Sequence, residues 1–238
     1  MTVSGPTFAG FSEAGIQFLA DLAEHNDRAW FQPRKADYER LLKEPLEALC
    51  VALDAAFRDR GVPLLADPAR SPFRIYRDVR FARDKSPYKT NVGASFAFVE
   101  RGLDGGPIAT STGARRGGGY FHFSPGEIFV GGGMWHPEPE PLVAWRALVL
   151  RDPDRVHAAI DDPSFAARFG EVGGDRLRRP PAGVPAGHPE LPLLLLKDVT
   201  FGRRLDDREA FSPDLPHVLA ADLARATPLL RLLASLGA

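Results

Sequence analysis

Residues 119–131 read Gly-Tyr-Phe-His-Phe-Ser-Pro-Gly-Glu-Ile-Phe-Val-Gly, and they decide the fold class. On both sides of Ser124-Pro125-Gly126-Glu127, an aliphatic or phenylalanine side chain recurs at every second position. This alternation is typical of a strand that buries one face. Proline followed by glycine suits the two central positions of a tight turn. The stretch therefore predicts an antiparallel hairpin.

The register of this hairpin follows from its turn. If Ser124 and Glu127 close the turn, two apolar pairs face one side of the sheet: Phe123 with Ile128 and Phe121 with Val130. The opposite side then carries a less apolar set: Tyr120, His122 and Phe129. We therefore expect one buried face and one more accessible face.

Strand and helix patterns continue outward from the hairpin. Residues 73–81 and 92–99 also alternate with a period of two, which predicts two more strands beside 119–124 and 127–132. The glycine-rich residues 102–118 are expected to form an exposed loop. Apolar residues recur at helical spacings before and after this region. The sequence thus predicts an α+β fold, with a central antiparallel sheet packed against helices from the N- and C-terminal parts of the chain.

Caps and prolines indicate where helices begin and bend. Ser12 is placed to cap the first helix, and the longer helix after it should kink at Pro45. Asp152-Pro153 and Asp162-Pro163 each combine a cap residue with a first-turn proline. The C-terminal helix should bend at Pro228.

Length and composition limit the class of protein. The chain has 238 residues, 44% hydrophobic and 26% charged, so it can bury a core without a metal or a disulfide. We expect one domain over residues 1–238. The net charge of −1 provides no general attraction to nucleic acid or to an anionic membrane. One cysteine allows no intrachain disulfide, and no signal peptide or membrane span is evident, so we expect a cytoplasmic protein without a membrane partner.

Residues 73–90 concentrate positive charge. They contain four Arg and two Lys against two Asp, a local charge of +4. On a strand, Arg77 would lie on the apolar face, where a guanidinium needs a partner. That partner is either a carboxylate of the protein or an anionic ligand such as a phosphate or carboxylate. The sequence leaves both alternatives open.

The candidate site combines this stretch with the less apolar face of the hairpin. Because Ser86-Pro87 should turn the chain back, the basic side chains could converge with two phenols on one anion-accepting pocket. The expected ligand-binding residues are Arg74, Arg77, Arg80, Lys85, Tyr88, Lys89 and Tyr120. His122 is the candidate catalytic residue, because an imidazole titrates near neutral pH. The alternative is that His122 is hydrogen-bonded scaffolding.

The sequence lacks the motifs of several other kinds of catalytic and cofactor chemistry. The sequence contains no G-x-S-x-G elbow, P-loop or dinucleotide fingerprint, and its six histidines have no metal-binding spacing. We therefore expect no metal and no cofactor. Cys50 lies among apolar residues and is expected to be a buried, inert thiol. Gly131-Gly132-Gly133 could let backbone amides approach a ligand, although such glycine clusters are more often turns.

Long motifs in the chain resemble those of one family. They are Phe18-Leu19 through Asn26-x-Arg28-x-Trp30-Phe31, Phe73 to Phe81 with Asp84 to Thr90, and Gly119 to Gly126 with Gly131 to Trp135. Over nearly its whole length the chain resembles the conserved hypothetical family catalogued as domain of unknown function 2461. The resemblance implies one family domain and draws attention to the basic stretch, but it implies no reaction. The chain departs from the family pattern at His25, Ala82 and Arg83, where Asn, Ser and Lys are expected; these differences leave the positive charge intact.

Three functions fit these observations. The first is a basic pocket for a phosphate- or carboxylate-bearing small molecule, with transferase or hydrolase chemistry as one form of it. The second is a nucleic-acid-binding module, suggested by aromatic residues interleaved with the basic ones, although the mixed charge elsewhere predicts weak binding. The third is a structural or adaptor protein whose basic residues form internal ion pairs. The sequence names neither a substrate nor an oligomeric state.

Overall fold

An antiparallel sheet forms the centre of the protein. The computed structural model describes residues 7–101, 107–110 and 117–237. The strands are β1 (Leu64–Leu65), β2 (Val92–Arg101), β3 (Pro107–Thr110), β4 (Gly118–Ser124), β5 (Glu127–Met134) and β6 (Val199–Arg204). Their order is β1-β2-β4-β5-β6, β3 pairs with β2 off this path, and each of these pairs is antiparallel. This arrangement confirms the α+β prediction.

The β4–β5 hairpin has the predicted register. Its buried cross-strand pairs are Phe121 with Val130 and Phe123 with Ile128. Phe11, from the chain before the first helix, stacks on both phenylalanines, with ring centroids 5.8 and 4.3 Å from theirs. The half-buried residues of the opposite face are Tyr120, His122 and Phe129. One face of the sheet therefore belongs to the core and the other is available for a site.

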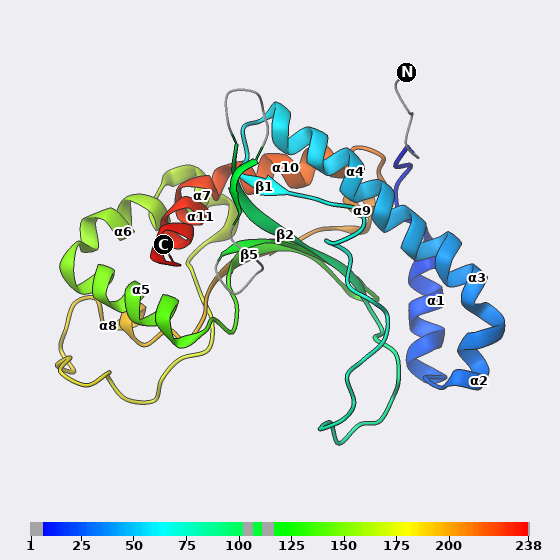
Figure 1. Ribbon diagram of the computed structural model, residues 1–238, viewed down its shortest axis with the longest axis horizontal. Coiled ribbons are helices and arrows are strands. Elements are labelled where there is room, and N and C mark those ends of the chain that lie inside the picture. The colour runs from blue at the N-terminus through cyan, green and yellow to red at the C-terminus, as the bar shows by residue number, and fades with distance from the viewer. Residues whose placement is uncertain (1–6, 102–106, 111–116, 238) are drawn as a thin grey trace.

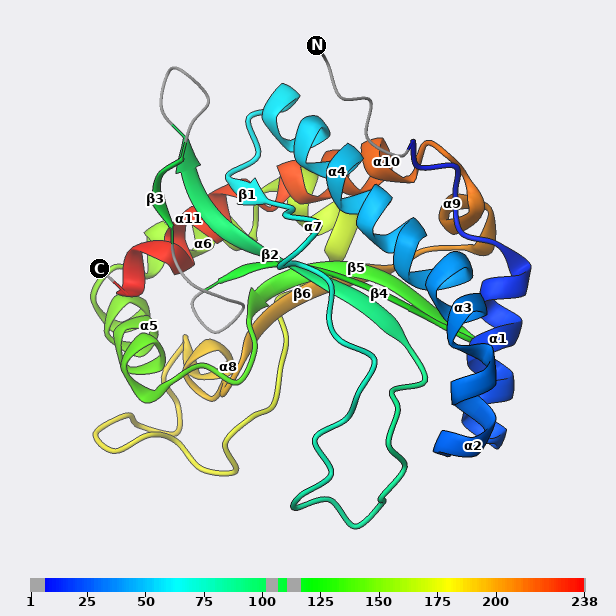
Figure 2. The same cartoon turned by 45° about the vertical axis from the view of Figure 1, so that its right-hand side comes forward.

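Helices from both parts of the chain pack around the sheet (Figure 1). The N-terminal part forms α1 (Glu13–Glu24), α2 (Arg28–Phe31), α3 (Lys35–Tyr38) and α4 (Glu44–Asp59), with the short turns η1 (Gln32–Arg34) and η2 (Glu39–Lys43) among them. The C-terminal part forms α5 (Pro139–Arg151), α6 (Pro153–Ile160), α7 (Pro163–Phe169), α8 (Leu191–Leu194), α9 (Asp207–Phe211), α10 (Leu215–Arg225), α11 (Thr227–Ala234) and η4 (Ser235–Gly237). Helices α4 and α10 lie side by side over the same face of the sheet (Figures 1 and 2).

Local signals account for the helix ends. The side chains of Ser12, Asp152 and Asp162 accept hydrogen bonds from the first turns of α1, α6 and α7. The predicted kink occurs at η2, a π-helical turn directly before α4, whose first turn contains Pro45. Pro228 lies in the first turn of α11, so the C-terminal helix is divided as predicted.

The buried side chains of the described residues form one hydrophobic cluster between the sheet and the helices. Trp145, Tyr88 and Phe31 are among the largest that are fully buried. Cys50 is also fully buried, and burial raises the pKa of its thiol to about 12. The expectation that Cys50 is buried is therefore confirmed.

The strand prediction for residues 73–81 is wrong. The segment makes only isolated bridges, Pro72 with Ala94 and Tyr76 with Tyr88. A strand needs one face that it can bury, and of the expected apolar face Ile75 is buried while Phe73 is 40% and Phe81 96% exposed. The chain therefore leaves the sheet after residue 72, folds back on itself, and rejoins it at β2.

Three observed strands, the two-residue β1 together with β3 and β6, lay outside the prediction. Strand β3 falls within the expected loop 102–118, whose residues 102–106 and 111–116 lie outside the described part of the chain. Strand β6 is short and has glycine at its centre, so its alternation is weak in the sequence. It nevertheless pairs with β5 over its full length.

The glycine triplet Gly131-Gly132-Gly133 lies inside β5, so it does not form a turn. A Cβ atom on each of these residues would lie 2.1–2.3 Å from a carbonyl oxygen of a neighbouring strand. Gly133 also has a φ of +109°, a conformation that other residues rarely adopt. The triplet therefore permits close approach of the adjacent strands.

Candidate functional site

The basic segment, which we define as residues 72–91, projects from the molecule on the side of the sheet opposite α4 and α10 (Figure 2). Its two limbs are joined by backbone hydrogen bonds from Arg77 to Pro87, 2.9 Å, and from Lys89 to Ile75, 2.8 Å. Its first limb is tied to the sheet by a 2.9 Å bond from the Phe73 N–H to the carbonyl of Gly93. The segment is thus an irregular hairpin rather than a strand of the sheet.

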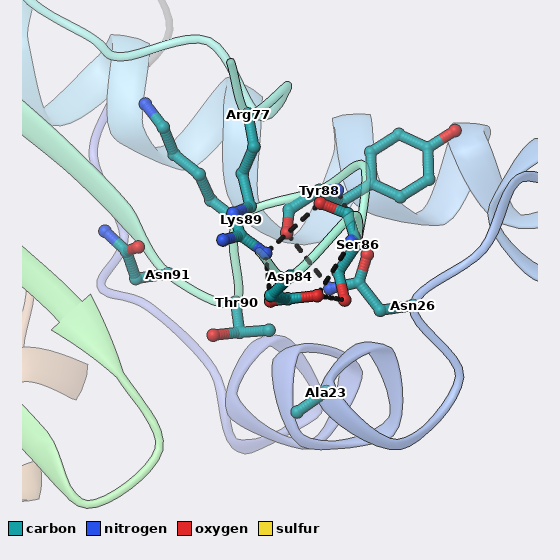
Figure 3. A pocket seen from close by; sticks show the side chains of 9 residues that line it. All are labelled: Ala23, Asn26, Arg77, Asp84, Ser86, Tyr88, Lys89, Thr90 and Asn91. Atoms are coloured by element: carbon teal, nitrogen blue, oxygen red, sulfur yellow. Dashed lines mark hydrogen bonds and ion pairs between the residues drawn. The ribbon is translucent and has the colours of Figure 1, made fainter. Parts of the chain in front are cut away.

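Asn26, at the corner between α1 and α2, fixes the base of the segment. Its amide oxygen accepts from the Tyr88 N–H and its amide nitrogen donates to the Tyr88 carbonyl, both at 3.0 Å. The Tyr88 ring is only 1% exposed and stacks on Phe31, with the ring centroids 4.1 Å apart. Figure 3 shows the ring directed away from Arg77 and Asp84. Tyr88 therefore anchors the segment through its ring and does not offer its phenol to the polar groups of the pocket.

A pocket of about 360 Å³ opens beside this anchor (Figure 3). It is polar, as expected for a site that takes a charged ligand. Its lining residues are Ala23, Asn26, Arg77, Asp84, Ser86, Tyr88, Lys89, Thr90 and Asn91.

Arg77 has an internal carboxylate partner. Its Nη1 donates to Asp84 and, at 3.2 Å, to the Ser86 carbonyl. Asp84 also accepts from the backbone N–H and the hydroxyl of Ser86, at 2.9 and 2.6 Å. These bonds, those from Ser86 first and then the one from Arg77, hold the pKa of Asp84 well below its usual range. Within the described part of the chain, Arg77 Nε and Nη2 donate to no other group, so they remain available at the pocket.

Lys89 differs from Arg77 in its charge environment. It lines the pocket half-buried, and its Nζ lies 5.1 Å from the centre of the Phe73 ring. No carboxylate of the described residues forms an ion pair with it. Burial, followed by repulsion from Arg74, lowers the pKa of Lys89. An anion in the pocket would oppose both effects.

The remaining basic residues lie toward the tip of the segment. The Arg80 guanidinium donates two hydrogen bonds to Asp78, at 3.0 and 2.7 Å, and the Arg80 backbone N–H donates a third, at 3.3 Å. These bonds lower the pKa of Asp78 to about 2. Lys85 donates to the carbonyl of Val79 at 2.9 Å. Arg83 is exposed and has no carboxylate partner among the described residues. The tip is therefore stabilised by its own contacts and leaves part of its charge uncompensated.

Tyr120 and His122 form a hydrogen-bonded pair on the more accessible face of the sheet. The Tyr120 hydroxyl lies 3.0 Å from His122 Nδ1, and His122 Nε2 lies 3.0 Å from the Ser124 hydroxyl. Burial raises the pKa of Tyr120 and lowers that of His122, so both favour the neutral form. Phe129 stacks on the imidazole, with the ring centroids 4.9 Å apart.

Asn91 and Phe73 connect this pair with the pocket. The amide nitrogen of Asn91, a lining residue, lies 3.5 Å from His122 Nδ1. The Phe73 ring lies between two groups of the site, with its centre 5.9 Å from the centre of Tyr120 and 5.1 Å from Lys89 Nζ. The accessible face of the sheet and the pocket are therefore adjacent.

The structure brings together only part of the predicted site. Arg77, Tyr88 and Lys89 line the pocket, and Tyr120 and His122 adjoin it through Asn91. Arg74 is exposed near Lys89, whereas Arg80 and Lys85 are engaged elsewhere in the segment. The sequence analysis missed the lining residues Asn26, Ser86, Thr90 and Asn91. Of these, Asn91 had a usable signal, because it directly precedes a predicted strand.

Among the described residues, no group of three or more His, Cys, Asp or Glu side chains could hold a metal ion. In the same part of the chain, no helix has the length and apolar character needed to span a membrane.

Comparison with known proteins identifies one family. The model of a family described as conserved hypothetical protein (DUF2461) matches residues 14–231. Neither the curated proteins nor the solved structures include a match to the chain.

Proposed function

The chain belongs to the DUF2461 family, and we propose that its function is to bind an anionic small molecule, phosphate- or carboxylate-bearing, in the pocket at the base of the basic segment. An enzyme of transferase or hydrolase type is one form of this proposal. A cytoplasmic location, consistent with the single buried cysteine, is part of it.

The proposal rests on the charge environment of Lys89. A half-buried ammonium normally has a carboxylate partner, because removing a charge from water is costly. Lys89 instead lines the pocket near Arg74, with no carboxylate among the described residues to neutralise it. An anion would restore the missing partner and would relieve the repulsion between the two cations.

The other lining groups fit the same ligand chemistry. The Thr90 hydroxyl and the Asn91 amide can donate hydrogen bonds, and Arg77 has donors that its bond to Asp84 does not use. Asp84 limits the charge of the site, because its carboxylate offsets Arg77 and would repel an anion placed against it. We therefore expect the ligand to bind at the Lys89, Thr90 and Asn91 side of the pocket.

A thermal-shift series tests this proposal. Inorganic phosphate, citrate and chloride would be compared at equal ionic strength, because specific binding raises the melting temperature by mass action and general screening does not. We expect phosphate or citrate, but not chloride, to raise the melting temperature of the wild-type protein. We expect Lys89→Met to abolish this increase and Arg83→Met, which removes the same charge outside the pocket, to preserve it. Equal responses to all three anions would contradict the proposal and favour a structural role of the basic residues.

A second candidate function is weak binding of single-stranded nucleic acid. It is favoured by the exposed rings of Phe81 and Tyr76, 96% and 46% accessible, and by the exposed Arg83, which has no carboxylate partner in the described part of the chain. Such rings can stack on bases while cations contact the phosphates. Fluorescence anisotropy with an oligonucleotide, measured against salt, tests it. Sub-micromolar affinity near physiological salt that falls in Phe81→Ser would place this function first.

A further inference from the structure

The hydrogen bonds around His122 have a definite direction. The Ser124 hydroxyl donates its one proton to the carbonyl of Glu127, at 3.0 Å, so toward His122 its oxygen can only accept. His122 Nε2 must then carry the proton of the neutral ring. Nδ1 is left with a free electron pair, which accepts from the Tyr120 hydroxyl at 3.0 Å. The Asn91 amide nitrogen, 3.5 Å away, is a second donor to the same atom.

A glycine on the neighbouring strand makes room for this contact. Gly93 lies directly across from His122 in the β2–β4 register. A Cβ atom at this position would lie 2.8 Å from the Phe121 carbonyl oxygen, 3.1 Å from the Tyr120 hydroxyl and 3.4 Å from the Tyr120 ring. A larger residue at position 93 would therefore press on both the Phe121 carbonyl and the phenol. Gly93 thus leaves room for the strand pairing and for the contact between Tyr120 and His122.

From these contacts we propose that Tyr120 and His122 form a proton-transfer pair for the molecule bound at Lys89. The inference rests on the proposed function and adds a substrate class to it: an anionic molecule that carries a second group able to release a proton. Tyr120 would contact this group and act as the catalytic residue. His122 would act through Tyr120, and Ser124 would hold the imidazole in the required tautomer.

The step conserves atoms and charge. The bond from the substrate atom to hydrogen breaks, and that proton joins the Tyr120 oxygen as the phenolic proton moves to Nδ1 of His122. The electron pair of the broken bond stays on the substrate. The products are a substrate anion on the side of Lys89 and Arg74, and an imidazolium whose Nε2–H still donates to Ser124.

The groups that set the charge of His122 support a base that is neutral before the reaction. Glu127, on the paired strand, is the acidic residue that acts on it, and it also lies 3.7 Å from Arg204, which shares its charge. Burial outweighs Glu127 and lowers the pKa of His122. Tyr120, Ser124, Phe129 and Asn91 contribute no formal charge at neutral pH. The nearest cationic element is the basic segment, whose charge an anionic ligand would offset.

Nitrogen-15 NMR of His122, combined with sulfate as a probe, tests the pair. Sulfate does not titrate near neutral pH, so any proton taken up on binding belongs to the protein. We expect the Nε2–H tautomer at pH 7.5, and we expect bound sulfate to raise the pKa of His122 by at least about half a unit, as an anion at the site should. Tyr120→Phe, which keeps the ring against Phe73 and Phe129, should reduce this increase by at least half. The control His217→Gln, at an exposed histidine, should leave it unchanged.

The possible failures are distinguishable. If sulfate binds to the wild type but not to Lys89→Met, and His122 shows the Nδ1–H tautomer or no change of pKa, the anion site stands and the proton-transfer pair is overturned. If sulfate binds equally to both proteins, or to neither, the proposed function fails and the inference fails with it. Should Tyr120→Phe not fold, Ser124→Ala replaces it, with the expected result that both tautomers of His122 become populated.

Discussion

Asn26 holds the backbone of Tyr88, 62 residues further along the chain, through a pair of hydrogen bonds that are each 3.0 Å long. This contact joins the corner of the first two helices to the basic segment, and it sets the floor of the pocket. The N-terminal helices therefore do more than cover the sheet. They fix the position of Lys89, the next residue, relative to the strand that carries His122.

Replacing Asn26 tests this relationship. Asn26→Ala should lower the free energy of unfolding by about 1–3 kcal/mol, because two backbone groups of Tyr88, a buried residue, lose their partner. The control Gln17→Ala removes an amide of α1 whose solvent-exposed hydrogen bond goes to Asp21, and it should cost less than about 0.5 kcal/mol. Urea denaturation measures both. Equal losses would mean that Asn26 does not anchor the segment.

The glycine triplet of β5 leads to a second prediction. Gly133→Ala should lower the free energy of unfolding by more than about 3 kcal/mol, because its Cβ would lie 2.1 Å from the carbonyl oxygen of Val199. Gly126 also has a positive φ, +74°, but a Cβ there meets nothing within 4 Å. Gly126→Ala should therefore cost only about 1–2 kcal/mol. Thermal denaturation of the two variants separates close contact from backbone strain, and similar losses would contradict the packing explanation.

His157 predicts a dependence of stability on pH. Its two ring nitrogens lie 2.8 Å from Glu190 and 2.8 Å from Asp161, and these contacts, Glu190 first, raise its pKa above the ordinary 6.5. A raised pKa in the folded state stabilises the fold below pH 6.5, and this contribution is lost as the pH rises through the folded value. His157→Gln should therefore be less stable than the wild type at pH 5.5 and nearly equal at pH 9. Denaturation at both pH values checks this, with His217→Gln as the control; a deficit that grows with pH would contradict it.

The pKa of Asp84 allows the contributions of Arg77 and Ser86 to be measured separately. Arg77→Met should raise the pKa of Asp84 only partly, because the bonds from Ser86 make the larger contribution. Ser86→Ala should raise it further. Arg80→Met should instead raise the pKa of Asp78, from about 2, and leave Asp84 unchanged. Carboxyl carbon-13 NMR reads both residues, and an Asp84 pKa that ignores Arg77 would show that their ion pair does not persist in solution.

The hairpin could be predicted from the sequence because its turn and its alternation specify the same register. The same alternation misled the analysis at residues 73–81. There Ile75 is buried but Phe73 and Phe81 are exposed, so the pattern did not produce a continuous buried face. An alternation with a period of two does not show whether another part of the protein covers the apolar face.

Only part of the candidate site could be predicted from the sequence. The concentration of charge was visible, and the pairing of Arg77 with a carboxylate of the protein was one of the two alternatives considered. The distinction between Arg77 and Lys89 depends on which carboxylates are near, and so on the fold-back of the segment. Asn26 could not be connected with Tyr88, because a contact across 62 residues leaves no local pattern.

Calorimetric titration of inorganic phosphate into the wild type, Lys89→Met and Arg83→Met tests the central claim most directly. We expect the wild type to bind phosphate, Lys89→Met to bind it at least tenfold more weakly, about 1.4 kcal/mol, and Arg83→Met to change the affinity less than twofold. Equal weakening in both variants would show that phosphate responds to the overall charge of the segment. That result, or the absence of binding to the wild type, would contradict an anion site at Lys89.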